Sequence, residues 1–386
     1  MPLNCEPADT SHYLYWIALK KVPGVGNRMC RRLVDRFGDP AKIATASRAS
    51  LLSIEGMNAK MADAVRAAVR DGKFADAVQR EHDLVVRRGY RLITLLDREY
   101  PRLLLEIHDP PPYLYARGQS FDLSPAVAIV GSRHPTGYGI SMAKRLGADL
   151  AARGFVVASG MATGIDAAAH QGALSAGGKT AAVLGSGLAV IYPPENRKLY
   201  HDIAASGVVL SELPVLEPPN AYNFPARNRI ISGMTLGTVV VEAAQKSGSL
   251  ITAKLAAEQG REVFAVPGSI KSCKSAGAHF LLKQGAKLVE KADDVIEEFT
   301  YLAGMGEPQP FLQGQSVPEN GNNASMDLTQ AESDVYCLLE PYPIHIDALA
   351  CKTDMDAAGL LAVLLKLELM GMVVQRPGKF FMSSGE

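Results

Sequence analysis

A short apolar run followed directly by a glycine turn is the feature that most limits how this chain folds. Residues 127–130 (Val-Ala-Ile-Val) are typical of a buried parallel strand, and Gly131-Ser132-Arg133 follows at once. After Pro135, Gly137 and Gly139, a helical pattern runs through Met142, Leu146 and Leu150. A strand, a glycine turn and a helix form the first unit of a doubly wound α/β fold, in which ligands lie at the carboxyl ends of strands. We therefore expect a Rossmann-like central domain whose phosphate-binding turn contains Gly131, Ser132 and Arg133.

This turn differs from the dinucleotide-binding fingerprint. Its glycines do not follow the G-x-G-x-x-G spacing, and no acidic residue stands about 20 positions further on to hold a ribose. The nearest one, Asp149, falls inside the predicted helix. The sequence therefore predicts a phosphate-binding turn without NAD, and we expect no cofactor.

A second glycine turn spans residues 156–170. An apolar strand ends in Ser159-Gly160, and small residues in such a turn let the backbone approach a ligand closely. Asp166 either caps the following helix or pairs with His170, which lies one helical turn later. A catalytic pair would also need a nucleophile, and the sequence shows none nearby. We assign Ser159 and Gly160 to the site and expect no catalytic residue.

A third motif places cationic and aromatic side chains together in residues 224–233 (FPARNRIISG). Arginine matches phosphate oxygens bidentately, asparagine offers a donor and an acceptor, and an aromatic face stacks on a base. Lys179 precedes another predicted strand and has a second interpretation as a solvated turn lysine. The predicted ligand-binding residues of this group are Lys179, Phe224, Arg227, Asn228 and Arg229.

The ordered set of motifs resembles the DNA-processing protein A family (DprA, also called Smf) over roughly residues 95–298. No single block is specific, but every block stands in family order. Two departures occur: His279 stands where the family usually has Asn, and Ser272-Cys273 replaces a common Ser-Pro pair. Besides the three motifs above, the blocks are Tyr100-Pro101, residues 109–118, Gly178 to Gly185, Tyr192-Pro193 with Asn196, Ser211-Glu212, Val241 to Ala243, Ser247 to Ala253, and Pro267-Gly268.

The resemblance implies a protein that binds single-stranded DNA without sequence preference and is not an enzyme. It also implies protection of the strand, handover to the RecA recombinase in natural transformation or repair, and a homodimer formed through the central domain. The alternative is a nucleotide-binding enzyme. Residues 237–242 (GTVVVE) resemble a signature of lysine-decarboxylase-like nucleoside phosphate hydrolases, although the glutamate comes one residue late and a double glycine is missing.

The regions on either side of the central domain (residues 76–300) predict two smaller domains. Residues 1–75 contain two glycine turns before helices, as in paired helix-hairpin-helix units or a sterile-alpha-motif-like bundle, with auxiliary DNA contact or a structural role both open. Residues 301–326 are rich in Gly and Pro and predict a flexible linker. Residues 327–386 predict three helices and a β-wing, a winged helix. Because its third helix is almost wholly apolar, we expect it to contact protein instead of a DNA groove.

The composition predicts a cytoplasmic protein that is neither exported nor inserted into a membrane. The chain has 386 residues and a formal net charge of zero, and no apolar run approaches the length of a membrane span. Five cysteines form no C-x-x-C pair, so we expect reduced thiols and no metal site. The zero net charge hides a gradient. Residues 1–100 carry 17 Lys and Arg against 12 Asp and Glu, whereas residues 325–386 carry 4 against 9.

Overall fold

The computed structural model describes residues 10–70, 73–119, 122–302, 329–339, 344–350, 352–353 and 355–383. The predicted linker at residues 301–326 lies outside the described residues except for its first two positions. Within the described residues, no helix is long and apolar enough to cross a bilayer.

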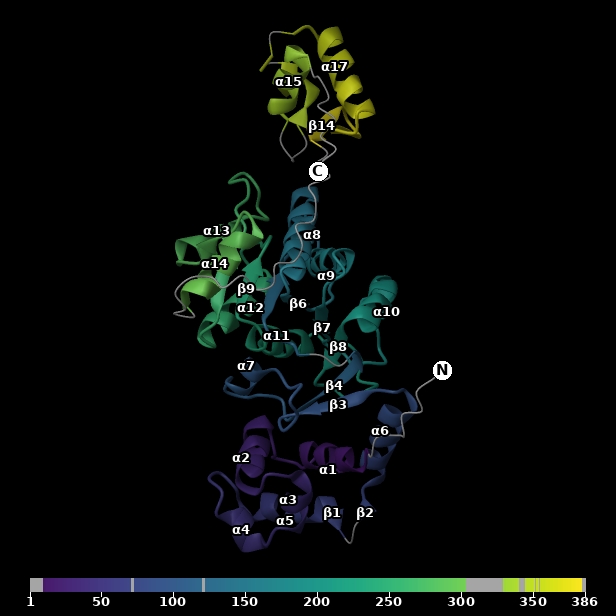
Figure 1. Cartoon of the computed structure of the whole chain (residues 1–386), viewed down its shortest axis with the longest axis vertical. Coiled ribbons are helices and arrows are strands. Elements are labelled where there is room, and N and C mark those ends of the chain that lie inside the picture. The colour runs from purple at the N-terminus through teal and green to yellow at the C-terminus, as the bar shows by residue number, and fades with distance from the viewer. Residues whose placement is uncertain are drawn as a thin grey trace. The chain divides into compact units, whose positions relative to one another are not determined.

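The chain begins with a bundle of short helices (Figure 1). Two helix–turn–helix units repeat the sequence pattern, and Gly24 and Gly56 in their turns have φ values of +86° and +84°, which only glycine adopts without strain. A small antiparallel pair and one further helix lead out of the bundle. The elements are α1 (Ser11–Lys20), α2 (Asn27–Phe37), α3 (Pro40–Thr45), α4 (Arg48–Leu52), α5 (Ala59–Ala68), β1 (Val69–Arg70), β2 (Lys73–Phe74) and α6 (Asp76–Arg87).

A nine-stranded sheet forms the central part, in the order β11-β10-β9-β5-β6-β7-β8-β4-β3. The seven strands from β11 to β8 are parallel, and β4 and β3 add an antiparallel edge. The strands are β3 (Arg91–Thr94), β4 (Tyr113–Gly118), β5 (Ala126–Val130), β6 (Val156–Ser159), β7 (Thr180–Val183), β8 (Val208–Ser211), β9 (Gly237–Val240), β10 (Glu262–Ala265) and β11 (Lys287–Leu288).

Helices connect these strands and pack against the sheet. For example, α9 packs on β5, β6 and β7, and α12 packs on β9 and β10. Five central strands, β5 to β9, are buried at every position, as continuous apolar runs predict. The helices are α7 (Arg102–Leu105), α8 (Gly137–Ala152), α9 (Ile165–Ser175), the 3-10 turn η1 (Pro194–Asn196), α10 (Arg197–Ser206), α11 (Asn223–Gly233), α12 (Gly248–Glu258), α13 (Ala276–Lys283) and α14 (Ala292–Leu302).

The sheet order confirms the doubly wound fold. From β5 the chain proceeds through β6, β7 and β8 on one side, then returns to form β9, β10 and β11 on the other. The connections that follow the neighbouring strands β5 and β9 therefore lead to opposite sides of the sheet, which opens a crevice at a topological switch point.

The helical bundle and the sheet share one hydrophobic core. A continuous cluster of buried residues runs from Trp16 and Leu33 in the bundle to Tyr115 in β4 and Val209 in β8. Glu81 of α6 adds a polar link, because its carboxylate accepts a hydrogen bond from the backbone amide of Val215 at 2.7 Å. The bundle and the central sheet therefore pack directly against each other, although the sequence predicts a domain boundary after residue 75.

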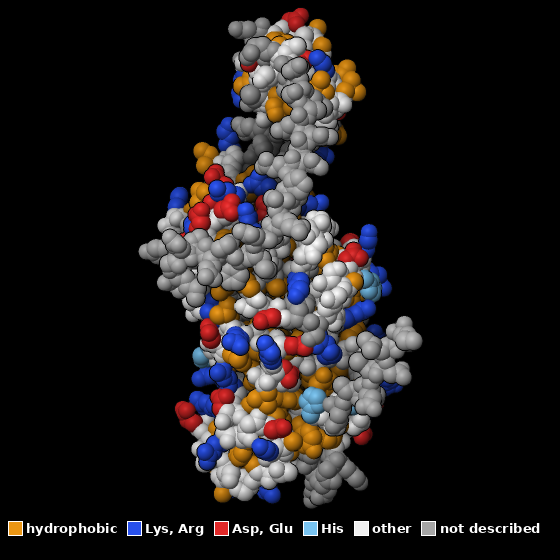
Figure 2. All heavy atoms as spheres, viewed as in Figure 1, with side chains coloured by type: hydrophobic (Ala, Val, Ile, Leu, Met, Phe, Trp, Pro, Cys, Tyr) orange, Lys and Arg blue, Asp and Glu red, His pale blue; other side chains and the backbone are white. Residues whose placement is uncertain are grey.

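The C-terminal region is a winged helix with its own core. Thr329 and Glu332 form a capping box at the first helix. Along the third helix, Leu360, Leu364 and Leu367 are buried, whereas Leu365 and others on the opposite side are exposed; Figure 2 shows hydrophobic side chains on the surface of this domain. The elements are α15 (Gln330–Cys337), β12 (Ile344–His345), α16 (Ile346–Ala350), α17 (Ala357–Leu369), β13 (Val373–Arg376) and β14 (Phe380–Ser383).

Candidate nucleic-acid site

The first predicted turn lies at the carboxyl end of β5, inside the switch-point crevice. Gly131 is required there, because a Cβ atom would stand 2.7 Å from Ile165 and 3.0 Å from the Glu242 carbonyl oxygen. Ser132 accepts a hydrogen bond from the backbone amide of His134. Arg133 is exposed, and its guanidinium lies 5.4 Å from the centre of the Phe224 ring. This arginine is a cation at the surface of the crevice, as predicted.

The second predicted turn follows β6 and is held by its own hydrogen bonds. Ser159 is fully buried and donates from its hydroxyl to the carbonyl oxygen of Ile129 at 2.6 Å. The backbone amide of Gly160 donates to the Asp166 carboxylate at 3.1 Å. Asn196 donates to the Met161 carbonyl at 2.8 Å, and Met161 itself has a φ of +55°. The Ser159 hydroxyl and the Gly160 amide are therefore engaged within the protein, and the turn shapes the cavity wall.

Asp166 and His170 do not form a pair. Asp166 holds the turn, and burial raises its pKa although the nearby Arg227 charge acts in the opposite direction. The Nδ1 atom of His170 lies 2.6 Å from the Thr180 hydroxyl, which donates onward to the Val157 carbonyl, so Nδ1 carries the ring proton. Burial lowers the pKa of His170 to about 3. The ring is neutral, and both side chains are part of the support for the site.

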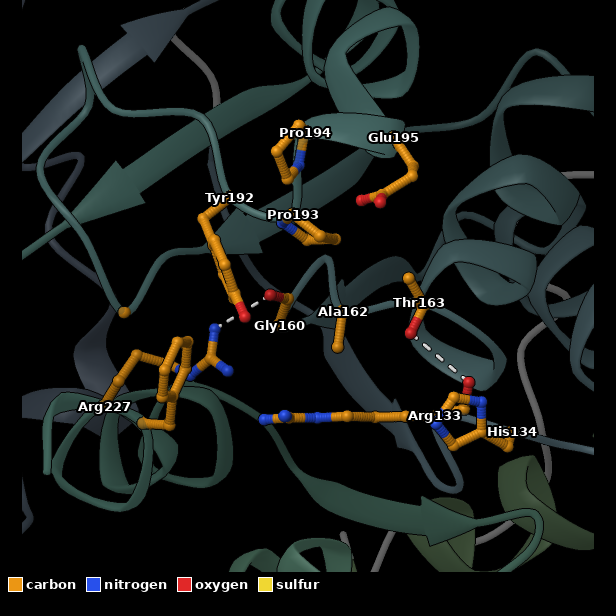
Figure 3. Close-up of a pocket in the computed structure, with 12 residues that line it drawn as sticks. Arg133, His134, Gly160, Ala162, Thr163, Tyr192, Pro193, Pro194, Glu195 and Arg227 are labelled. Carbon is orange, nitrogen blue, oxygen red and sulfur yellow. Dashed lines mark hydrogen bonds between the residues drawn. The ribbon is translucent and has the colours of Figure 1, made fainter. Parts of the chain in front are cut away.

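Arg227 points inward from α11 and does not lie on the surface. The residue is 7% exposed, and its guanidinium donates to the carbonyl oxygens of Gly160 and Val183 at the ends of β6 and β7 (Figure 3). Burial lowers its pKa to about 10, so it remains charged at neutral pH. The sequence predicts a surface phosphate ligand here. The structure shows instead a buried cation that lines the crevice and whose guanidinium joins two strand ends.

Arg229 lies on a different side of the same helix. Residues two apart on a helix point about 200° apart, so Arg227 and Arg229 cannot face one ligand. Arg229 forms ion pairs with Glu212 and, at 3.2 Å, with Asp109. The structure thus places Arg229 outside the crevice. Asn228 lines the crevice and accepts a hydrogen bond from Arg227 Nε at 3.2 Å.

Lys179 lies at the amino-terminal ends of the parallel strands, and the other predicted residues lie at or near the carboxyl-terminal ends. It precedes β7, and its backbone carbonyl accepts a hydrogen bond from Val157 near the start of β6. The crevice lies at the carboxyl ends of the same strands. The structure therefore does not bring Lys179 to the site.

Two adjoining cavities occupy the crevice. The smaller has a volume of about 320 Å³ and the larger about 770 Å³. Arg133, Tyr192 and Phe224 line both, and the two rings have their centroids 5.7 Å apart with planes tilted by 43°. A Cβ atom at Gly185 would stand 2.6 Å from Phe224, so this glycine allows the ring to lie against the end of β7.

Several lining residues were not predicted as ligand contacts. The smaller cavity is also lined by Tyr192, Glu195 and His134, and the larger by Lys246, Ser249 and Thr252. Tyr192 belongs to a motif of the family resemblance, and so do Ser249 and Thr252. These motifs helped to identify the family resemblance. Their residue types alone did not indicate contact with a ligand.

The larger cavity meets the start of α12. Ser247 caps this helix by accepting from the backbone amide of Ser249 at 3.3 Å, and Lys246 precedes it on the exposed side. Thr252 is 2% exposed, and its hydroxyl has no hydrogen-bond partner among the described residues. The positive end of a helix dipole, a lysine and a hydroxyl suit an anion.

Of the residues behind the enzymatic alternative, Thr238 lies inside the sheet, and Glu242 is buried just after the carboxyl end of β9. Thr238 is fully buried in β9, where it pairs with Ala128 and Val263 of the neighbouring strands. A threonine within a central strand is not part of a phosphate-binding turn. The resemblance of residues 237–242 to the hydrolase signature therefore does not extend to its geometry.

The fold and the crevice define a class: a Rossmann-like protein with a crevice at its switch point, a helix-hairpin-helix bundle and a winged helix. Comparison with known families agrees over each part. Residues 91–300 match the DNA recombination-mediator protein A family, residues 17–71 a SAM-like helix-hairpin-helix tandem, and residues 321–379 the DprA winged helix domain. The chain belongs to the DNA-processing protein A (DprA/Smf) family.

Individual relatives resemble most of the chain. Protein Smf of Synechocystis is 35% identical over 95% of this chain and 98% of its own length. The crystal structure of DNA processing protein A from Streptococcus pneumoniae is similar with a TM-score of 0.62 and 37% identity, covering 74% of this chain and 97% of that one. DNA processing protein A of Helicobacter pylori, solved to study its single-stranded DNA binding mode, has a TM-score of 0.50 and 31% identity over 55% of this chain and 96% of that one.

Proposed function

We propose that this protein binds single-stranded DNA along the switch-point crevice and is not an enzyme. The observation that carries the proposal is the grouping of Arg133 with the rings of Phe224 and Tyr192 at the carboxyl ends of parallel strands. A cation beside stacking surfaces suits a strand whose bases are unpaired, and it needs no particular sequence. The Helicobacter pylori relative, with its single-stranded DNA binding mode, supports the same role.

The phosphate backbone follows the larger cavity in this proposal. Arg133 stands where the two cavities meet, and Lys246 with the start of α12 continues the positive character beyond it. Arg227, Asp166 and Asn196 hold the strand-end turns in place below. The ligand therefore meets a surface whose shape is fixed in advance, which reduces the entropy lost on binding.

A titration with matched oligonucleotides tests the proposal. The full-length protein should bind a single strand of mixed sequence more tightly than a duplex of the same length at the same salt concentration. Equal affinity for the two would contradict the proposal. Release of a free base from a nucleoside monophosphate by the purified protein would contradict its non-enzymatic part.

We further propose that the protein works as a cytoplasmic homodimer that protects the strand and helps to load RecA in transformation or repair. Family membership supports this role. Exposed apolar side chains support a dimer: Leu288 lies in the edge strand β11, Phe280 in the preceding helix α13, and Ile270 in the loop after β10. Phe280→Glu should yield monomers in sedimentation, and the wild-type chain should speed RecA assembly on a coated strand. A monomeric wild-type chain, or no effect on RecA, would contradict the respective part.

A further inference from the structure

The smaller cavity has a polarity that a simple phosphate site would not have. Arg133 and His134 lie on one side, and the carboxylate of Glu195 lies on the other (Figure 3). Glu195 belongs to the short turn η1, directly after Tyr192 and two prolines. No hydrogen bond or ion pair engages its carboxylate among the described residues. A free carboxylate therefore stands on the wall of a cavity that also contains an exposed arginine.

A carboxylate repels phosphate oxygens, so it does not suit a wall along which a DNA backbone runs. The larger cavity offers that path, because Lys246 and the start of α12 line it. Its one lining carboxylate, Asp166, is occupied by the amides of Gly160 and Ala162. The two cavities therefore suit different parts of a nucleotide. The phosphate suits Arg133 and the larger cavity, and the base suits the smaller cavity, toward Glu195.

A base fits the smaller cavity in size and in its walls. Its volume of about 320 Å³ lies at the lower end of small-ligand sites, which begin near 300 Å³. Tyr192 is 40% exposed and presents its ring there, and Phe224 stands beside it. An unpaired base that stacks on these rings directs an edge away from its own phosphate, toward the wall that carries Glu195.

We propose that Glu195 selects bases that carry an amino group over thymine. A carboxylate accepts hydrogen bonds only, so it favours the amino groups of cytosine, adenine and guanine. The N–H and amino groups of guanine are adjacent and match both carboxylate oxygens. Thymine instead presents one N–H between two carbonyl oxygens, which the carboxylate repels. The inference rests on the proposed function and adds a base preference to binding that is otherwise independent of sequence.

Titrations of the full-length chain with two homopolymers of equal length, oligo-dC and oligo-dT, test the inference. Both are flexible pyrimidine strands, so their difference reports the base edge. The wild-type chain should bind oligo-dC about fivefold more tightly or better, in line with a good base contact. Glu195→Ala should bring the ratio to about one and bind oligo-dT more tightly than the wild type does, because the repelling charge is gone.

Asp202→Asn is the matched control, since Asp202 is an exposed acid on the next helix, α10, and lines neither cavity. It should keep the wild-type preference. Equal affinity of the wild type for oligo-dC and oligo-dT, or an unchanged preference in Glu195→Ala, would overturn the inference. In both cases, binding of the two strands would still uphold the proposed function. Failure of every variant and of the wild type to bind either strand would overturn both.

Discussion

Three consecutive residues of α11 have three different roles, and their spacing on the helix explains why. Arg227 faces the strand ends, Asn228 faces the crevice, and Arg229 faces the loop that carries Glu212. Each step along a helix turns the side chain by about 100°. A cluster of cations in the sequence is therefore distributed over separate surroundings once the helix forms. Arg133 and Lys246 remain the exposed cations of the crevice.

Arg133 is the residue at which removal of a cation should affect DNA binding most directly. We expect Arg133→Ala to weaken single-strand affinity about tenfold, the size of one charged hydrogen bond. The slope of log affinity against log salt should fall by about 0.7, because one phosphate is no longer neutralised. Lys179→Ala removes the same charge at the amino-terminal end of β7, away from the crevice, and should change affinity by less than about twofold. Fluorescence anisotropy at several salt concentrations measures both.

Two results would contradict this assignment. An unchanged salt slope in Arg133→Ala, with folding intact, would mean that its guanidinium does not contact phosphate. A greater weakening in Lys179→Ala than in Arg133→Ala would place the strand at the amino ends of the sheet.

At the residue scale, the sequence could predict positions in the chain better than directions of side chains. Gly131 and Arg133 follow a recognisable strand, so their place at its carboxyl end was predictable. Lys179 precedes its strand, so strand direction alone would have placed it at the amino-terminal end, away from the crevice. The burial of Arg227 was not predictable, because it depends on how α11 packs over the ends of β6 and β7. The carboxylate of Glu195 is separated from Phe224 by 29 positions, and only the fold brings them together.

At the scale of elements, α11 connects the crevice to the helical bundle. Glu212, directly after β8, pairs with Arg229 of α11 and accepts hydrogen bonds from Lys20 at the end of α1 and Asn27 at the start of α2. The side chains of Arg229 and Glu212 are only 12% and 17% exposed. In the bundle, the basic helix α2 is also used internally, since Arg31 donates to the Leu105 carbonyl. These contacts support the structural role that the sequence left open for the bundle.

We expect Glu212→Gln to destabilise the bundle by about 2 kcal/mol. The substitution leaves two cations without their shared carboxylate in a poorly solvated place, which costs more than an exposed pair does. Trp16 is the single tryptophan of the chain and lies buried in α1, so its fluorescence during urea unfolding reports on this region. Glu258→Gln removes the exposed pair with Lys254 and should cost under about 0.5 kcal/mol. Equal effects of the two substitutions would show that the Glu212 contacts do not secure the bundle.

The elements themselves were largely predictable, because each has a local signal. Apolar runs marked the parallel strands, glycine turns marked the hairpins, and three helices with a wing were apparent after residue 327. The continuous core between bundle and sheet was not predictable from these signals, because it joins residues far apart in the sequence, such as Trp16 and Val209, in one cluster. The same holds for α17, whose leucines all look alike in the sequence although three face the core and three are exposed: Leu360, Leu364 and Leu367 are buried, and Leu361, Leu365 and Leu369 are exposed.

At the scale of the whole molecule, the acidic net charge of the C-terminal tail makes it unsuited to binding DNA. Residues 325–386 carry 4 Lys and Arg against 9 Asp and Glu. Lys366 is the one basic residue of α17, and it pairs with Glu332 at 2.6 Å. Arg376 and Lys379 lie on the wing, and the acids of the same region outnumber the cations. The exposed leucines of α17 suit contact with a protein better than contact with a DNA groove.

Removal of the tail should therefore leave the strand-binding site working. We expect truncation after Leu302 to change single-strand affinity by less than about threefold, or under about 1 kcal/mol. The isolated tail, residues 327–386, should fold around its own core and bind no DNA at moderate salt, because its net charge repels the phosphates. Titration of both pieces beside the full chain measures this. A tenfold or greater drop in affinity on truncation, in a chain that keeps its oligomeric state, would make the winged helix a DNA-binding element after all.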